Sequence, residues 1–301
     1  MSFHTRKSTT MVAVEGGKVQ VRYYEPHNAE YAQRTPVLML HGGPGASHEV
    51  LYDTVHPLAD ERPVIFYDQL GSFHSPADLS ENQMTVERYA DEISCILQSF
   101  NLEEVVLFGH SWGAALATYS TLNHRNNVAA LVLTSPLLST QKWLDDCAIL
   151  LNRLPEDVQQ TIETCEQEGA TDTARYHKAV TVFDEFFFIR SKKTATKDIW
   201  NKHKGKLAEN IYNAMWGPSE FRCDGLLKKF DLFYRLEDIE IPTLILTGEY
   251  DFARPETMKE AQSKIAGSSL TVVPDSGHMI FLDDPDTCVD ATNKFLAENK
   301  V

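Results

Sequence analysis

A serine between two glycines is the most chemically suggestive feature of this sequence. It lies in Gly109-His110-Ser111-Trp112-Gly113, after an apolar run and before an alanine-rich stretch. In a sharp turn from a buried strand into a helix, side chains at the two glycine positions would collide with neighbouring backbone. The amino terminus of the following helix also favours developing negative charge. We therefore predict that Ser111 is a nucleophile in acyl transfer.

A serine nucleophile needs a base, and the base needs an acid that orients it. His278 lies in a loop near the C-terminus, directly after an expected strand, and Asp251 follows another. The carboxyl ends of parallel strands form the edge at which sites are built. We predict His278 as the base and Asp251 as the acid, with Glu249 and Asp275 as alternative acids.

A glycine-rich turn, His41-Gly42-Gly43-Pro44-Gly45, follows the apolar run Val37–Leu40. Such a turn can offer a backbone N–H to an oxyanion, and the residue after the nucleophile can offer the second. We predict that these donors are Gly43 and Trp112, and that His41 has a structural role. Acyl transfer of this kind requires no metal and no cofactor.

Apolar runs mark the elements that must position these residues. We predict strands at Met11–Val14, Val19–Tyr24, Val37–Leu40, Val64–Tyr67, Val105–Phe108, Val128–Leu133, Ile241–Leu246 and Ser269–Val273. Helical spacing predicts helices at Thr85–Phe100, Trp112–Leu122, Pro255–Ile265 and Pro285–Leu296. The first two strands form a hairpin. The later continuous runs, which alternate with helices, indicate an α/β fold with a mostly parallel sheet covered on both faces.

The alternation of strands and helices stops near residue 135 and resumes near residue 241. The intervening stretch has helical patterns and no convincing strand. We therefore predict a core formed by residues 1–136 and 238–301, with residues 137–237 inserted as a helical cap.

Composition excludes several other classes of protein. The chain of 301 residues carries 28 basic and 43 acidic side chains, a net charge of −15, which argues against nucleic acid and anionic membranes as partners. No apolar run approaches the roughly 18 residues of a membrane span, and the first 25 residues contain no signal-peptide core. The five cysteines are scattered without CxxC spacing. We expect a cytoplasmic protein that acts on a small molecule or short peptide.

Four segments together resemble the proline iminopeptidases, a branch of the α/β-hydrolases. They are HGGPG at residues 41–45, YDQLGS at 67–72, GHSWG at 109–113 and GPSEF at 217–221. The similarity runs from about residue 35 to the C-terminus. It implies an α/β-hydrolase core with a helical cap, and it gives Ser111, Asp251 and His278 the roles already predicted for them, with Gly43 and Trp112 as oxyanion donors.

The resemblance also implies a site for the free amino terminus of a substrate. Glu220 matches a carboxylate that binds this ammonium group in the family. A second acidic residue often follows the triad acid, and here that position is Phe252. We include Glu220, Phe252 and the aromatic cap residue Trp216 as predicted substrate-binding residues.

Two hydrolytic functions follow from these residues. The first is a serine aminopeptidase or amidase that releases an amino-terminal residue such as proline, which rests on Glu220. The second is an esterase or lactonase that acts on a bulky non-peptide ester such as a macrolide-type lactone, which rests on Phe252 and the aromatic cap. A non-catalytic binding protein on the same fold is a third alternative, disfavoured by the intact set of Ser111, Asp251 and His278.

Overall fold

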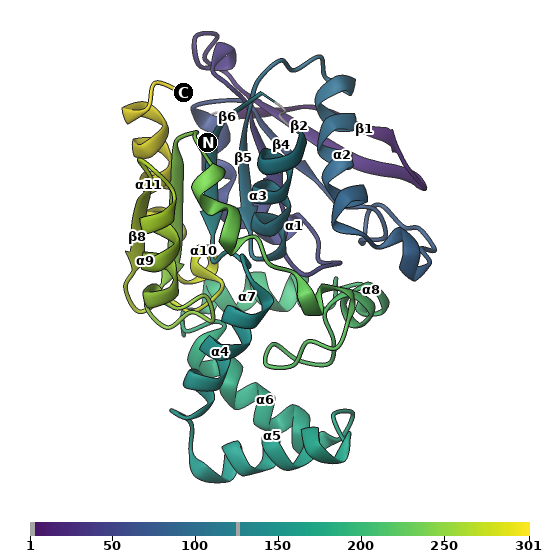
Figure 1. The fold of residues 1–301 in the computed structure, drawn as a ribbon. Helices are drawn as coiled ribbons and strands as arrows, with labels where there is room; N and C mark the ends of the chain where they lie inside the picture. Colours follow the sequence, from purple (N-terminus) through teal and green to yellow (C-terminus); the bar gives the residue numbers. More distant parts are fainter. Residues whose placement is uncertain (1–3, 125–126) are drawn as a thin grey trace.

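One eight-stranded sheet runs through the centre of the protein, in the strand order β1-β2-β4-β3-β5-β6-β7-β8 (Figure 1). The computed structural model describes residues 4–124 and 127–301, so residues 1–3 and 125–126 of the predicted core lie outside the described residues. The strands are β1 (His4–Val14), β2 (Gly17–Pro26), β3 (Val37–Leu40), β4 (Val64–Tyr67), β5 (Val105–His110), β6 (Val128–Thr134), β7 (Thr243–Gly248) and β8 (Ser269–Val273).

The sheet is antiparallel at one edge and parallel elsewhere. β1 and β2 form the expected hairpin, and β2 pairs antiparallel with β4. All pairs from β4 through β3, β5, β6 and β7 to β8 are parallel. This arrangement confirms the predicted mostly parallel α/β sheet. It also aligns the carboxyl ends of β3, β5, β7 and β8, from which the predicted site residues follow.

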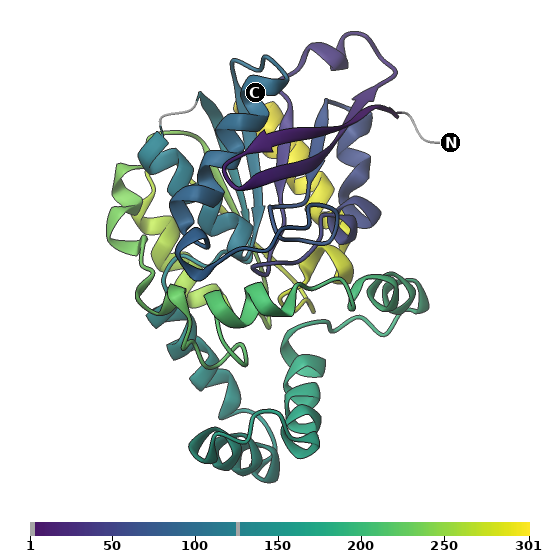
Figure 2. The ribbon, with the colours of Figure 1, turned by 90° about the vertical axis from the view of Figure 1, so that its right-hand side faces the viewer.

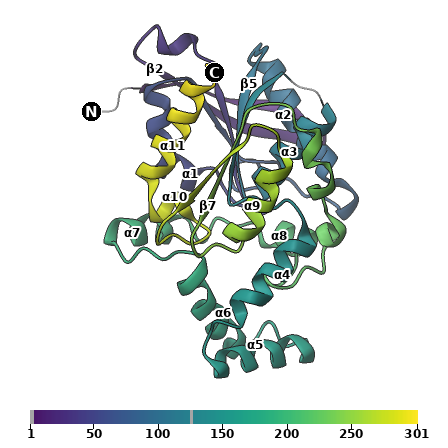
Figure 3. The ribbon, with the colours of Figure 1, turned by 60° about the vertical axis from the view of Figure 1, so that its left-hand side comes forward.

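Helices cover both faces of the sheet. They are α1 (Glu49–Val55), α2 (Val86–Ser99), α3 (Trp112–His124), α9 (Pro255–Lys264), α10 (Ile280–Asp283) and α11 (Pro285–Glu298). Figure 3 shows α1, α10 and α11 on one side of the sheet and α2, α3 and α9 on the other. Side chains of β5 alternate between the two layers. Val105 and Leu107 join the apolar cluster on the α2/α3 side, and Val106 and Phe108 join the one on the α1/α11 side.

The chain between β6 and β7 is helical. It contains α4 (Thr140–Leu151), α5 (Glu156–Glu168), α6 (Ala174–Phe187), α7 (Thr194–His203) and α8 (Glu209–Met215). We call residues 137–237 the cap and the rest of the chain the core; this division of domains stays a prediction. Figures 1 and 2 show α5 and α6 as the part of the cap that lies farthest from the sheet.

Most differences from the predicted elements concern their ends. β5 continues two residues beyond Phe108, and β7 begins at Thr243, after Pro242, whose ring nitrogen has no hydrogen to donate to the ladder. The short helix α10 was not predicted, because four residues are too few to show helical periodicity. Among the residues that the structure describes, none of the helices is long and apolar enough to cross a membrane.

Candidate active site

Ser111 occupies a strained turn between β5 and α3. Its φ is 53°, in the left-handed region, which non-glycine residues adopt rarely. A Cβ on Gly113 would overlap with the carbonyl oxygen of Leu40, and one on Gly109 would overlap with that of Gly113. The Ser111 N–H donates to Thr134 O over 2.9 Å, which ties the turn to β6. These contacts give the steric reason for glycine on both sides of the serine.

His278 and Asp251 meet at the carboxyl edge of the sheet. His278 Nδ1 lies 2.8 Å from Asp251 Oδ1, and the Asp251 side chain is completely buried. The Asp251 carboxylate also accepts from Ala253 N at 3.0 Å, Thr247 Oγ1 at 3.1 Å and Gly248 N at 3.4 Å. With these bonds it can hold the imidazole in one orientation, with Nδ1 as the donor and Nε2 left for chemistry. The alternative acids Glu249 and Asp275 are exposed, and the backbone N–H of Asp275 donates to the Glu249 carboxylate.

Aromatic rings enclose the imidazole of His278. Phe252 stacks on it with a centroid distance of 4.8 Å, and Trp143 contacts it edge-on at 5.2 Å. The ring of His110 lies 4.8 Å away. Burial, together with the nearby His278, holds the pKa of His110 well below its ordinary value. A neutral His110 therefore places no positive charge beside His278.

The cap helps to position the loop that carries His278. The His278 N–H donates to Phe187 O at 2.8 Å, and the Met279 N–H donates to Phe188 O at 2.9 Å. On the core side, Ser135 Oγ donates to His278 O at 2.8 Å. The end of α6 and the turn after β6 thus hold this loop between them.

Two backbone amides are free to bind an oxyanion. Gly43 lines the same pocket as Ser111, and its φ of 112° requires glycine. Trp112 is the first residue of α3. Among the described residues, none accepts a hydrogen bond from the N–H of Gly43 or of Trp112. Unpaired donors beside a serine at a helix amino terminus can stabilise negative charge on a tetrahedral intermediate.

Gln69 links the two segments that carry these amides. Its Oε1 accepts from Trp112 Nε1 at 2.9 Å, and its Nε2 donates to His41 O at 2.9 Å. Its N–H donates to His41 Nε2 at 3.0 Å, and His41 Nδ1 donates to Gly42 O at 2.9 Å. Burial lowers the pKa of His41, so the ring is neutral and acts as a structural hydrogen-bonding group, as expected.

A pocket of about 330 Å³ lies between core and cap, within the range of ligand pockets. Ser111, His278 and Gly43 contribute to the core side of its wall. The cap side includes α6, the end of α7 with the segment after it, and the residues around Glu220. The structure thus brings the predicted nucleophile, base and oxyanion turn to one cavity that the cap covers.

Two carboxylates of the cap face this pocket. Glu220 Oε1 accepts a hydrogen bond from Tyr212 Oη at 2.6 Å, and Asp184 lies on the same wall. Burial and the charge of Glu220 raise the pKa of Asp184 to about 8, and burial raises the pKa of Glu220 as well. Among the described residues, no cationic side chain pairs with either carboxylate. A cation bound here can pair with Glu220 and shift Asp184 toward its ionised form.

The sequence prediction missed Asp184, although the chain carries a signal for it. Asp184 stands four residues after Val180, on the same face of α6, and four residues before Phe188, which directly follows the helix; all three line the pocket. A carboxylate between two apolar residues at this spacing is unusual for a packed helix face. Gln69 was also missed as a link, because nothing in the sequence shows that it reaches both His41 and Trp112.

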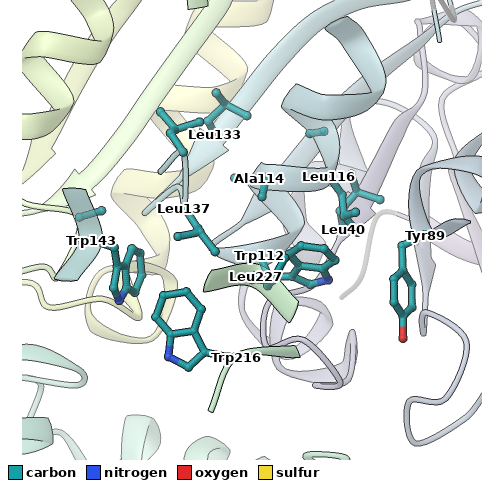
Figure 4. Packing of buried hydrophobic residues seen from close by; sticks show 14 of the residues in the cluster. Leu40, Tyr89, Trp112, Ala114, Leu116, Leu133, Leu137, Trp143, Trp216 and Leu227 are labelled. Carbon is teal, nitrogen blue, oxygen red and sulfur yellow. The ribbon is translucent and has the colours of Figure 1, made fainter. Parts of the chain in front are cut away.

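Phe252 and Trp216 lie behind the pocket wall rather than on it. Phe252 is fully buried and stacks on His278, and Trp216 is 3% exposed. Figure 4 shows Trp216 beside Trp143, with a centroid distance of 6.0 Å, and its Nε1 donates to Ser219 O at 2.8 Å. Both rings therefore support residues that line the pocket, and neither forms its surface.

The chain is similar in sequence and in structure to known proteins. The alpha/beta hydrolase fold family matches residues 35–285. A proline iminopeptidase of Heyndrickxia coagulans is 37% identical over 285 residues, which cover 95% of this chain and 97% of the relative. The crystal structure of VinJ is similar with a TM-score of 0.87 at 27% identity, covering 98% of this chain and 99% of VinJ. That of a proline iminopeptidase from Mycobacterium smegmatis has a TM-score of 0.85 at 26% identity, covering 97% and 98%.

Proposed function

Because the chain belongs to the alpha/beta hydrolase family and is a serine-type hydrolase with proline iminopeptidase relatives, we propose that it is an aminopeptidase. In this proposal it releases the amino-terminal residue of a short peptide, with proline as the first candidate. The observation that carries it is the pair of cap carboxylates, Asp184 and Glu220, which share a pocket with Ser111 and have no cationic partner in the part of the chain that the structure describes.

The chemistry that we propose is acyl transfer in two steps. Ser111 Oγ attacks the carbonyl carbon of the first peptide bond while His278 Nε2 takes its proton, and Asp251 stabilises the resulting imidazolium. The N–H groups of Gly43 and Trp112 bind the oxyanion. His278 then protonates the leaving amine as the C–N bond breaks. Water, deprotonated by His278, attacks the acyl-enzyme and releases the amino acid and the free serine.

The cap carboxylates favour an amine substrate over a neutral ester or lactone. A protonated amino terminus placed between Glu220 and Asp184 gains charge-assisted hydrogen bonds and favours the ionised form of Asp184, against the burial and the Glu220 charge that raise its pKa. A neutral lactone in the same place would leave the partly buried Glu220 carboxylate without a cation, which is costly. Asp184 also supplies the second acidic group that is absent at Phe252.

A substrate panel tests the proposal. The wild-type protein should cleave a prolyl amide reporter, and acetylation of its amino group should abolish turnover. Ser111→Ala should reduce turnover by about 10⁴-fold or more and prevent labelling by a fluorophosphonate probe. Cleavage of the acetylated reporter, a simple ester or a macrolide lactone at a rate equal to that of the free amine would overturn the proposal in favour of an esterase or lactonase. Absence of probe labelling in the wild type would favour a binding protein.

Substitutions in the cap test the amine site itself. Glu220→Gln and Asp184→Asn should each lower kcat/KM for the free-amine reporter by about 50-fold, the effect of losing a hydrogen bond to a charged group. Glu185→Gln is the matched control, because Glu185 is the neighbour of Asp184 and is exposed to solvent. Equal effects of Asp184→Asn and Glu185→Gln would rule out a specific role for Asp184.

A further inference from the structure

The pocket that contains the two cap carboxylates also has a cationic part. Lys204 and Lys206, in the segment that follows α7, line the pocket together with His203. Figures 1 and 3 show α7 well separated from α8, the helix whose Tyr212 bonds to Glu220. The charges in this pocket thus come in two groups of opposite sign, carried by different elements of the cap.

Basic side chains outnumber acidic ones in the cationic group. Lys206 pairs with Glu49 at the start of α1, and Glu49 also lies 2.9 Å from His74 Nε2, 3.6 Å from His203 Nδ1 and 3.7 Å from Arg22 Nη2. Although burial acts in the opposite direction, Lys206 and His74 lower the pKa of Glu49 to about 2. Several basic groups therefore share this one ionised carboxylate.

Two further basic side chains of this region have few or no acidic partners among the described residues. Lys204 is exposed to solvent at the pocket wall, and no acidic side chain among the described residues pairs with it. His203 is buried and bonds through Nε2 to Asp53 at 2.7 Å, while its Nδ1 lies 3.6 Å from Glu49 and has no hydrogen-bond partner among the described residues. An anionic group of a ligand would find an available ammonium group here and a net positive surrounding.

Resting on the proposed aminopeptidase function, we propose that Lys204 and Lys206 recognise the free carboxylate at the C-terminus of the substrate. The preferred substrates are then di- and tripeptides with both ends charged. The ammonium group lies at Glu220 and Asp184, the first peptide bond lies at Ser111, and the carboxylate of the leaving part lies at the lysines. A cavity of about 330 Å³ suits a peptide of this length.

The chemistry of the leaving part distinguishes this proposal from a general aminopeptidase. An amidated or reporter-linked substrate has the amine and the scissile bond but lacks the negative charge. A longer peptide moves its carboxylate away from the lysines. Both changes remove an interaction that binds the leaving part and leave the acyl part of the substrate unchanged.

The test compares a dipeptide with its C-terminal amide. For prolyl-alanine and prolyl-alaninamide, the wild type should show a kcat/KM about 10-fold higher for the free acid, and added salt should reduce this ratio because screening weakens charge pairing. Lys204→Gln should bring the ratio close to one, and Lys204→Glu should invert it. Lys197→Gln, on an exposed position of α7 outside the pocket, should leave the ratio unchanged.

The outcomes separate this inference from the proposed function. Equal rates for acid and amide in the wild type, or an unchanged ratio in Lys204→Gln, would overturn carboxylate recognition and leave the aminopeptidase intact. Failure to cleave either dipeptide, combined with turnover of esters, would overturn both proposals. Thermal unfolding of Lys204→Gln and Lys197→Gln shows whether each variant is folded before its ratio is interpreted.

Discussion

The Asp251 carboxylate in the core accepts hydrogen bonds from four groups, whereas the Asp184 carboxylate in the cap accepts none from the described residues. The protein itself thus stabilises the charge on Asp251, while burial and a like charge raise the pKa of Asp184 to about 8. The core thus supplies every partner for the group that holds His278. The cap instead leaves two carboxyl groups without a cation, and a positively charged ligand can pair with them.

Removal of the negative charge of Asp251 should have the largest effect on activity. Asp251→Asn should lower kcat by about 10⁴-fold, because the amide cannot hold the His278 tautomer that accepts a proton at Nε2. Glu249→Gln is the control, since Glu249 lies in the same turn and is exposed. Steady-state kinetics with the prolyl reporter measure both. Equal losses in the two variants would show that the turn, rather than Asp251, determines activity.

A smaller effect should follow from loss of Gln69, which belongs to the core and touches no substrate. Gln69→Met keeps the volume and removes the bonds to Trp112 Nε1 and His41 O. We expect kcat to fall about 10-fold, less than the loss of an oxyanion donor, with KM within about twofold of wild type. The exposed Gln98→Met is the control. A rise in KM without a change in kcat would contradict a role in positioning the oxyanion donors.

The smallest expected effect concerns the stability of the folded protein, and it arises from Asp184 in the cap. The carboxyl group of Asp184 has a pKa of about 8 in the folded protein and about 3.9 in the unfolded chain. Between these pH values it is protonated in the folded protein and ionised in the unfolded chain. The free energy of unfolding therefore falls as pH rises between these values. Asp184→Asn removes this penalty and should raise Tm by about 2 °C or more at pH 9.

Scanning calorimetry at several pH values checks this prediction. The difference in Tm between Asp184→Asn and wild type should widen from pH 5 to pH 9. Glu185→Gln should show no such widening, because its carboxylate is exposed. A constant difference across this range would mean that Asp184 titrates normally in the empty pocket.

The core could be predicted from the sequence because each of its features leaves a local trace. Buried parallel strands appear as continuous apolar runs, and the sharp turn at Ser111 requires glycine on both sides. His278 and Asp251 are brought together because β7 and β8 are neighbouring parallel strands, so that the loops after them meet at one edge. The pattern therefore placed both residues at this edge, while it left Glu249 and Asp275 as alternative acids.

The cap could be predicted as helical, and the family resemblance pointed to Glu220 at the substrate, but the position of Asp184 beside it was not predicted. Asp184 and Glu220 lie 36 positions apart on separate cap elements, and their meeting depends on how the cap helices pack. Phe252 was expected at the substrate because it follows the triad acid, and Trp216 because it is an aromatic residue of the cap, yet tertiary packing places both behind the wall. Residues that act through packing rather than through a turn or a strand end carry no local signature.

The late position of β7 and β8 has a consequence for synthesis. Ser111 and Gly43 are translated early, but Asp251 and His278 follow the last two strands of the sheet. Under the proposed mechanism, a growing chain on the ribosome carries a serine with no base and no orienting acid. Translation must proceed almost to the final helix before the nucleophile can be activated, because this step needs both Asp251 and His278.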